Sequence, residues 1–131
     1  MTNLDIVKAY QDAIWLQKDI SAIDKFFDET AIVHSPVEAT KGTEKMKAVI
    51  LQWHKAFPGL KVVWDDFICD DDKVVSRWHA QGLHEGEFLG NPPSKSLVKY
   101  AGVTIYQLSN QKIIQYWAFV DLYNLLKSIK I

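Results

Sequence analysis

The chain has 131 residues, a formal net charge of −1 at pH 7 and 48% hydrophobic residues, including five Trp, five Tyr and six Phe. This length suits one domain over residues 1–131 with a sizeable core, and the near-neutral charge excludes the basic surface that binds nucleic acid or anionic membranes. The single cysteine, Cys69, excludes an intrachain disulfide and favours a reducing compartment.

Helical periodicity governs the first part of the chain. Apolar residues recur three and four positions apart over residues 3–18, which predicts an amphipathic helix, and a short second helix is expected over 20–27. A brief strand over 31–34 follows. A second long helix is predicted over 43–57, because Pro58-Gly59 ends the pattern.

Beyond Gly59 the pattern changes to strands rich in β-branched and aromatic residues. The predicted strands cover residues 60–66, 67–70, 74–87, 97–108 and 111–120. Polar turns at 70–72 and 109–110 read as hairpin tips, which predicts a mainly antiparallel sheet, and a last helix is expected over 122–129. Helices that precede a run of long strands indicate an α+β fold in which the helices cover one face of a curved sheet.

The last predicted strand is apolar on both faces. Ile113, Trp117 and Phe119 are expected on one face, and the other carries Ile114, Tyr116, Ala118 and Val120. Helices can cover only one of these faces, so the second apolar face requires another cover, most simply a second subunit. We therefore hypothesise a homodimer that forms through the outer face of the sheet.

Other expected features concern location and charge. The N-terminal residues lack the regions of a secretory signal, and no apolar run is long enough to span a membrane, so we expect a cytoplasmic protein. The His, Asp and Glu residues show no recognised metal-ligand spacing, which predicts no metal site. Arg77, the one arginine, lies mid-strand, and Glu85, Glu87 or a partner subunit is expected to pair with it.

Two segments carry a recognisable motif. Residues 84–93 read HEGEFLGNPP, and residues 115–121 read QYWAFVD. With the order of the predicted elements, they resemble the signature of the SnoaL-like polyketide cyclases, in which Gly-x-Phe-x-Gly-x-Pro-Pro precedes a last strand with an aromatic pair and an aspartate. Gln115 and Tyr116 depart from this pattern, because the family frequently has Glu-His there, so the identity of the substrate does not transfer.

The resemblance implies the cone-shaped fold of the nuclear transport factor 2-like superfamily. It also implies an enzyme that closes carbon rings in an apolar pocket, with one carboxylate as acid and base and without metal or organic cofactor, on a small apolar or aromatic carbonyl compound. The carboxylate that matches is Asp121. From the residues alone, Asp121 can instead cap the following helix, because aspartate is a favoured N-cap residue.

Further residues match positions that shape the pocket in this family. His34 could polarise a carbonyl group, and a structural hydrogen-bonding role is the alternative. His84 is expected either to orient the loop that follows it or to face the cavity. Trp15, Leu51 and Trp53 lie where two helices would close the mouth of the cone, so they either line the substrate pocket or pack in the core.

The face that carries Trp117, Phe119 and Asp121 would form an aromatic wall if it lines the cone. Removal of Asp121 from water would then raise the pKa of its carboxyl toward the range useful for proton transfer. We predict a cyclase that performs an intramolecular aldol ring closure or a related isomerisation. A ketosteroid isomerase-like enzyme and a noncatalytic, dimeric small-molecule-binding module are the alternatives.

Overall fold

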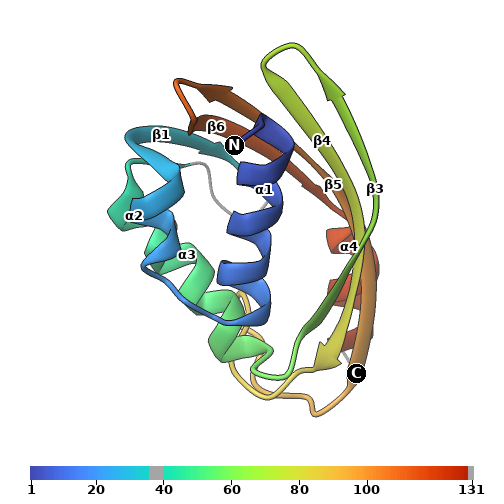
Figure 1. Cartoon of the computed structure of the whole chain (residues 1–131). Helices are drawn as coiled ribbons and strands as arrows, with labels where there is room; N and C mark the ends of the chain where they lie inside the picture. Colours follow the sequence, from blue (N-terminus) through green and yellow to red (C-terminus); the bar gives the residue numbers. More distant parts are fainter. Residues whose placement is uncertain (36–39, 130–131) are drawn as a thin grey trace.

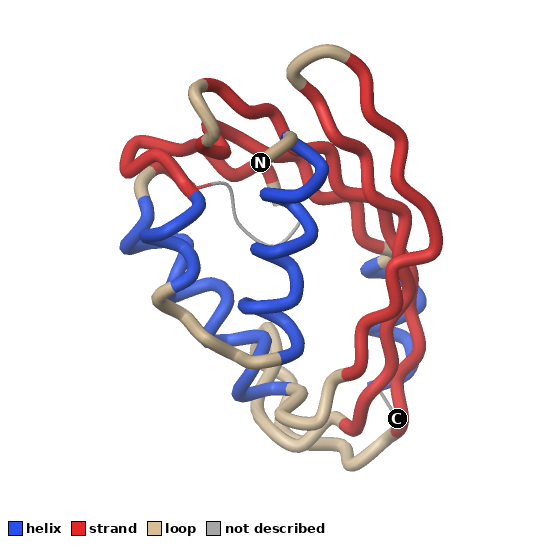
Figure 2. Tube along the Cα trace, viewed as in Figure 1, coloured by secondary structure: helices blue, strands red, loops and turns tan. Residues whose placement is uncertain are grey.

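A computed structural model describes residues 1–35 and 40–129 of the chain. It has the predicted α+β fold, in which helices lie against the concave face of one curved sheet (Figure 1, Figure 2). None of the helices in the described part is long and apolar enough to cross a membrane. In chain order the elements are α1 (Asn3–Gln11), the π-helical segment η1 (Asp12–Leu16), α2 (Ala22–Phe26), β1 (Phe27–His34), β2 (Thr40–Lys41), α3 (Thr43–Ala56), β3 (Lys61–Asp70), β4 (Lys73–Leu83), β5 (Leu97–Ser109), β6 (Lys112–Val120) and α4 (Leu122–Ile129).

One six-stranded sheet, in the order β2-β1-β6-β5-β4-β3, forms the frame. β1 and β6 pair in parallel, and the other neighbouring strands pair antiparallel. β4 and β5 pair along the whole of β4, from Lys73 opposite Gln107 to Leu83 opposite Leu97. These long strands bend around α1 and α3, which leaves the helices on the inner side of the curve (Figure 1).

The first helix begins with a capping box and ends with a wider turn. The N–H of Asp5 donates to Thr2 Oγ1, and the N–H of Thr2 donates to the Asp5 carboxylate, both at 3.1 Å. In η1 the N–H of Gln17 donates to the carbonyl oxygen of Asp12 at 3.0 Å, five residues earlier. Such π-helical turns occur frequently at functional sites, and this one carries Trp15.

Strand β3 corrects one prediction, and the hairpin tips confirm another. The segments 60–66 and 67–70 were expected as two strands, but a bulge at Asp65 shifts the register without ending the strand. Asp71 and Asn110 have positive φ angles at the two predicted hairpin tips. Asp and Asn tolerate this backbone conformation better than most residues, so these tips turn where the sequence predicts.

Strand β4 ends at Leu83, before the predicted boundary, because the chain there turns to contact the end of α3. The N–H groups of Glu85 and Gly86 both donate to the carbonyl oxygen of Ala56, at 2.9 and 3.1 Å. A Cβ atom on Gly86 would lie 2.2 Å from the carbonyl oxygen of Lys55. Only glycine therefore permits this approach of the loop to the helix.

The faces of β6 differ from the prediction at Ile113. Ile113 was expected beside Trp117 and Phe119, but it is fully buried on the inner face, because the register between β5 and β6 shifts at Ile114. Beyond the shift, the side chains that face inward are Tyr116, Ala118 and Val120. Trp117 and Phe119 face outward, and Phe119 is 58% exposed.

Two buried clusters fill the inner side of the sheet. The first packs α1 and α2 against β1 and neighbouring strands of the sheet, around Tyr10 and Phe27. The second joins α3 and α4 to β4 and β5 around Trp53 and Leu125. Trp15 packs against both clusters, so the π-helical segment lies where they meet.

Candidate functional site

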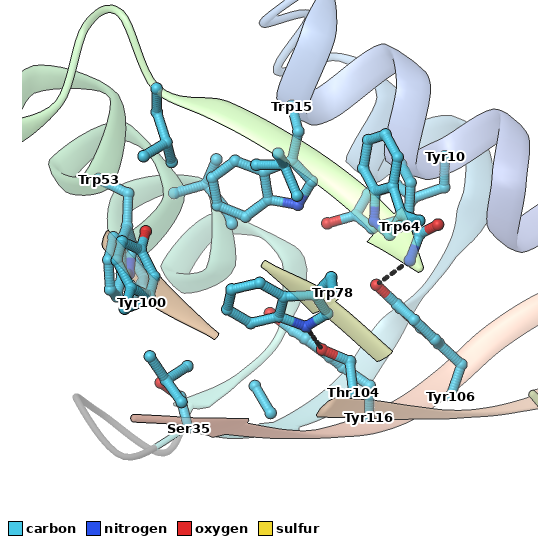
Figure 3. Close-up of a pocket in the computed structure, with 17 residues that line it drawn as sticks. Tyr10, Trp15, Ser35, Trp53, Trp64, Trp78, Tyr100, Thr104, Tyr106 and Tyr116 are labelled. Atoms are coloured by element: carbon cyan, nitrogen blue, oxygen red, sulfur yellow. Dashed lines mark hydrogen bonds between the residues drawn. The ribbon is translucent and has the colours of Figure 1, made fainter. Parts of the chain in front are cut away.

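A partly open cavity of about 80 Å³ lies between the helices and the inner face of the sheet (Figure 3). Four of the five tryptophans and four of the five tyrosines of the chain line it. These aromatic residues are Tyr10, Trp15, Trp53, Trp64, Trp78, Tyr100, Tyr106 and Tyr116. The cavity wall is therefore mainly aromatic, as in sites that bind small apolar molecules.

The alternation of side chains along the strands brings these residues together. On β4 and β5 the even-numbered residues face inward, so Trp78, Tyr100 and Tyr106 reach the cavity. Arg77 and His79, at odd-numbered positions of β4, face outward and are exposed. The opposite wall comes from α1, η1 and α3.

Few polar side chains other than the tyrosines reach the cavity, and hydrogen bonds fix two of them. Trp78 Nε1 donates to Thr104 Oγ1 at 3.0 Å. Gln11 Nε2 donates to Ser76 Oγ at 3.1 Å. It also donates to the Tyr106 hydroxyl at 3.4 Å (Figure 3). Gln11 is only 2% exposed, so its amide belongs to the interior of the protein.

Burial keeps the tyrosine hydroxyls of the cavity protonated. It raises the pKa of Tyr106 to about 12, although the hydrogen bond with Gln11 opposes part of this effect. Burial also raises the pKa of Tyr10, Tyr100 and Tyr116 well above the ordinary tyrosine value. At neutral pH these groups are uncharged donors that can bind a carbonyl oxygen.

Charged groups are missing from the cavity wall as far as the structure describes it. Within residues 1–35 and 40–129, the wall contains no carboxylate, imidazole or cationic side chain. The same residues contain no group of three or more side chains that could hold a metal ion. The wall suits an uncharged ligand, because a charged one would lose its hydration without gaining a counter-charge.

The predicted residues on the helices divide into two groups. Trp15 and Trp53 line the cavity, and Trp53 also packs against Tyr100 with ring centroids 5.9 Å apart. Leu51 lies on the outer side of α3, 44% exposed, and is not part of the cavity wall. Ile50 and Trp53, within the same turn of α3, face inward instead.

His84 lies in the loop after β4 rather than in the cavity wall. It is fully buried, and its Nδ1 accepts a hydrogen bond from the N–H of Ser94 at 3.1 Å. The Ser94 hydroxyl also lies 2.9 Å from Nδ1, and the ring packs on Phe57. Of the two roles expected for His84, these contacts match the one in which it orients the loop.

Asp121 caps α4 instead of facing the cavity. The N–H of Asn124 donates to its Oδ1 at 3.2 Å, and Asn124 Nδ2 donates to Oδ2 at 2.5 Å. As predicted, Asp121 shares a side of β6 with Trp117 and Phe119, but this side is the outer face. This outer face does not line the cone, because the β6 residues that line the cavity are Tyr116, Ala118 and Val120.

His34, Trp117 and Phe119 also lie on the outer face. The rings of His34 and Trp117 stack with centroids 5.3 Å apart and an angle of 6° between their planes. His34 Nε2 forms a hydrogen bond with Gln115 Oε1 at 3.2 Å. The structure thus brings His34 and Trp117 together, but away from the cavity.

A shallow groove on the outer face contains Phe119, Asp121 and Arg77. Arg77 is 60% exposed, and its Nη1 lies 3.9 Å from the carboxylate of Asp65 on β3. The prediction that Arg77 pairs with Glu85 or Glu87 is wrong. Both glutamates follow the end of β4, and the bulge in β3 places Asp65 beside Arg77 instead.

Most of the cavity wall was missed by sequence reasoning, although a signal was present. The odd-numbered residues of β4 are mainly polar, for example Arg77, His79 and Gln81, whereas Val74, Trp78 and Ala80 are apolar. This alternation marks the even-numbered side as the buried one. Extended to β5, it identifies Tyr100 and Tyr106 as cavity residues.

The family model for SnoaL-like polyketide cyclases matches residues 4–129. No curated protein matches the chain. A protein from Jannaschia sp. CCS1, described as a candidate SnoaL-like polyketide cyclase, is 26% identical; the match covers 97% of this chain and 90% of that one, with a TM-score of 0.91.

Two further solved structures share the fold at lower identity. AclR from Streptomyces galilaeus, described as a candidate hydroxylase, is 22% identical over 97% of this chain and 94% of that one, with a TM-score of 0.84. A SnoaL-like polyketide cyclase from Agrobacterium tumefaciens is 18% identical over 97% of each chain, with a TM-score of 0.78.

Proposed function

The chain belongs to the SnoaL-like polyketide cyclase family, and we propose that it binds a compact, uncharged carbonyl compound in the aromatic cavity and promotes an intramolecular aldol ring closure or a related isomerisation. The observation that carries this proposal is the cavity wall of tryptophans and tyrosines, in which the described residues place no charged side chain. No metal or organic cofactor takes part in the proposed reaction.

The size of the cavity limits the ligand. One water molecule needs roughly 10–15 Å³ of such volume, so a cavity of about 80 Å³ accommodates several waters or one small organic molecule. A ligand of one or two rings fits this space, whereas a long polycyclic compound would require the aromatic side chains to move. We therefore propose a compact substrate.

The proposed reaction begins when a base removes a proton from a carbon atom next to a carbonyl group. The resulting enolate attacks a second carbonyl carbon of the same molecule, and the new alkoxide then takes up the proton. Hydroxyl groups such as those of Tyr100 and Tyr116 would donate hydrogen bonds to the oxygen on which charge develops. Each such donor is typically worth about 3 kcal/mol in the transition state.

Asp121 is the acid and base that the family resemblance suggests, and this role requires a change of position. Val120, the residue before it, lines the cavity, so the carboxylate is one residue away from the wall. To reach a ligand it would have to give up its bonds to Asn124 and enter from the first turn of α4. We propose no catalytic role for His34, because it is exposed and stacked on Trp117 on the outer face.

A second candidate function is noncatalytic binding of a small molecule. It is favoured by one observation, namely that the described cavity wall offers donors and aromatic surface but no carboxylate or imidazole to transfer protons. Under this function Asp121 serves only as the helix cap.

We also propose that the outer face of the sheet pairs with a second copy of the chain. This face exposes apolar side chains, including Val63 (49%) and Phe119 (58%). The groove there holds a cation, Arg77, and an anion, Asp121. Charges of both signs on one surface suit a two-fold contact in which each copy meets the same surface of the other.

Binding and proton exchange together test the proposed function. Four tryptophans line the cavity, so fluorescence should change saturably when a one- or two-ring diketone binds. Exchange of the acidic carbon-bound protons for deuterium, followed by NMR, should be faster with the native chain than with Asp121→Asn. Binding without accelerated exchange would favour the noncatalytic function, and no binding by any compact carbonyl compound would contradict both functions.

A further inference from the structure

We propose that the ligand carries a hydroxyl or enol group, and that Gln11 Oε1 accepts a hydrogen bond from it at the end of the cavity next to Tyr106. This inference rests on the proposed function, because it concerns the same cavity. It adds a polar requirement to a ligand otherwise defined by size and aromatic surface.

The bonds of the Gln11 amide leave one atom for the ligand. An amide nitrogen has two hydrogens, and Nε2 directs one toward Ser76 Oγ (3.1 Å) and one toward the Tyr106 hydroxyl (3.4 Å). Ser76 is fully buried and Tyr106 is 4% exposed. The donors of Gln11 are therefore fully used, and the amide is held between β4 and β5.

The oxygen of the same amide has no partner. Gln11 Oε1 is buried, and no described residue donates a hydrogen bond to it. Gln11 is 2% exposed and forms part of the cavity wall, while Oε1 itself has almost no accessible surface, so a ligand reaches this oxygen when the amide shifts slightly toward the cavity. A buried acceptor without a donor is unfavourable, so a ligand that brings an O–H group to this atom gains affinity that an otherwise identical ligand lacks.

The cavity thus has two kinds of polar group. The tyrosine hydroxyls can donate to a carbonyl oxygen, while Gln11 Oε1 can only accept. A hydroxy ketone, or the enol form of a diketone, offers one acceptor and one donor in a single compact molecule. A simple ketone or a methyl ether satisfies the tyrosines but leaves Gln11 unpaired.

The reverse orientation of the amide makes the opposite prediction. The hydroxyls of Ser76 and Tyr106 can donate as well as accept, so they could bind Oε1 and leave Nε2 facing the ligand. A ligand acceptor would then be preferred at this position, and the methyl ether would bind at least as well as the hydroxyl compound.

Matched ligands test the inference in the native protein. The probes are tetralone, a hydroxytetralone with its phenol on the ring remote from the ketone, and the corresponding methoxytetralone, titrated by calorimetry. We expect the hydroxyl compound to bind roughly tenfold more tightly than either of the others, which is the effect of about one hydrogen bond to a buried group. Equal affinities, or a preference for the methyl ether, would overturn the inference.

Two variants assign the preference to Gln11. Gln11→Met has a similar shape without the acceptor, so it should bind all three compounds with similar affinity. Gln11→Glu retains an acceptor oxygen and should keep the preference for the hydroxyl compound. A preference that survives in Gln11→Met would overturn the role of Gln11, while the proposed function would stand because tetralone still binds. Failure of all three compounds to bind the native chain would instead contradict the proposed function, and this inference with it.

Discussion

At the scale of single residues, Asp121 shows how neighbouring side chains at a strand end enter different environments. Val120 lines the cavity, and the next side chain points to the opposite face because strand side chains alternate. The carboxylate then lies beside the first turn of α4, where Asn124 donates to both of its oxygens. Its contribution in this position is to accept a hydrogen bond from the Asn124 N–H, one of the backbone groups that a helix start leaves unpaired.

Two substitutions at Asp121 separate capping from chemistry. Asp121→Ala should lower the free energy of unfolding by about 0.5–2 kcal/mol, because alanine cannot accept the N–H bond, whereas Asp121→Asn should keep most of the stability. Urea unfolding at neutral pH measures both. An equal loss in the two variants would contradict the capping role.

His54 is a partly buried histidine whose charge should affect stability. It lies on α3 with its ring 5.4 Å from that of Trp15. Burial lowers the pKa of His54; the backbone of Ile14 opposes this effect in part, and the charge of Lys18 adds to it. The unfolded chain therefore binds a proton at His54 more readily than the folded chain does.

The pH dependence follows from this direction. The contribution of His54 to stability is complete above the ordinary histidine pKa of 6.5 and is lost as the pH falls through that value toward the lower pKa of the folded state. Between about pH 7.5 and 5, the free energy of unfolding should fall more for the native chain than for His54→Asn. The same decline in both proteins would show that His54 does not titrate as described.

At the scale of elements, the contact between the loop after β4 and the end of α3 depends on Gly86. Gly86→Ala should lower the free energy of unfolding by about 1–3 kcal/mol, because its Cβ would meet the carbonyl oxygen of Lys55, a backbone atom that cannot move aside. Gly59→Ala is the control, since no atom lies within 4 Å of the Cβ it would add. Thermal unfolding compares them, and equal midpoints would contradict this account.

The order and type of the elements follow from local patterns, whereas the exceptions arise from the pairing between strands. Helical periodicity and the Pro58-Gly59 stop locate α3, and polar tips locate the hairpins. The bulge at Asp65 and the register shift at Ile114 were not predicted, because they depend on pairing with neighbouring strands rather than on the residues themselves. The shift at Ile114 reverses the face on which Ile113 lies.

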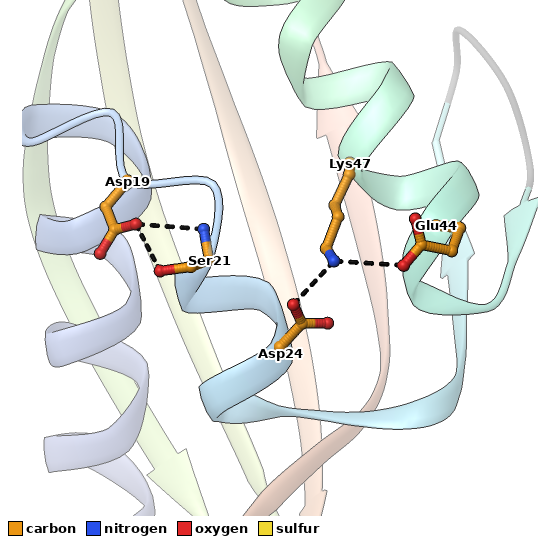
Figure 4. A network of polar contacts seen from close by, with 5 residues as sticks. All are labelled: Asp19, Ser21, Asp24, Glu44 and Lys47. Atoms are coloured by element: carbon orange, nitrogen blue, oxygen red, sulfur yellow. Dashed lines mark hydrogen bonds and ion pairs between the residues drawn. The ribbon is translucent and has the colours of Figure 1, made fainter.

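At the scale of the whole molecule, the sheet has two different faces. The helices cover the inner face (Figure 1). The aromatic cavity lies on this side, while Trp117 and Phe119 are on the outer face. Lys47 adds an ion pair with Asp24 at 2.7 Å that links α3 to α2 on the helical side (Figure 4). The outer face has no such cover among the described residues, which is the basis of the proposed dimer.

Sedimentation velocity at micromolar protein tests that dimer. The native protein should sediment as a particle with twice the 15.0 kDa mass of one chain. Phe119→Lys should lower the measured mass toward that of the monomer, because it places a charge in the contact. Leu51→Lys, on the outer side of α3, should leave the mass unchanged. A native monomer would contradict the proposal.

The site was less predictable than the fold, for a physical reason. Trp15 and Trp53 were predicted because the family resemblance places pocket residues on these two helices, but the same reasoning also included Leu51, which lies outside the cavity wall. The faces of β6 required the pairing of the whole sheet, so Trp117 and Asp121 were assigned to a pocket that lies on the other side. Gln11 has no signal in the sequence, because its role depends on Ser76 and Tyr106, which are far away along the chain.

The most direct test of the central claim compares two adjacent residues of β6 for binding of a two-ring diketone by calorimetry. Ala118→Phe fills the cavity, and Phe119→Ala changes only the outer face. We predict that Ala118→Phe abolishes binding, whereas Phe119→Ala binds the diketone as the native chain does. Binding that survives in Ala118→Phe and is lost in Phe119→Ala would place the ligand in the outer groove and contradict the account.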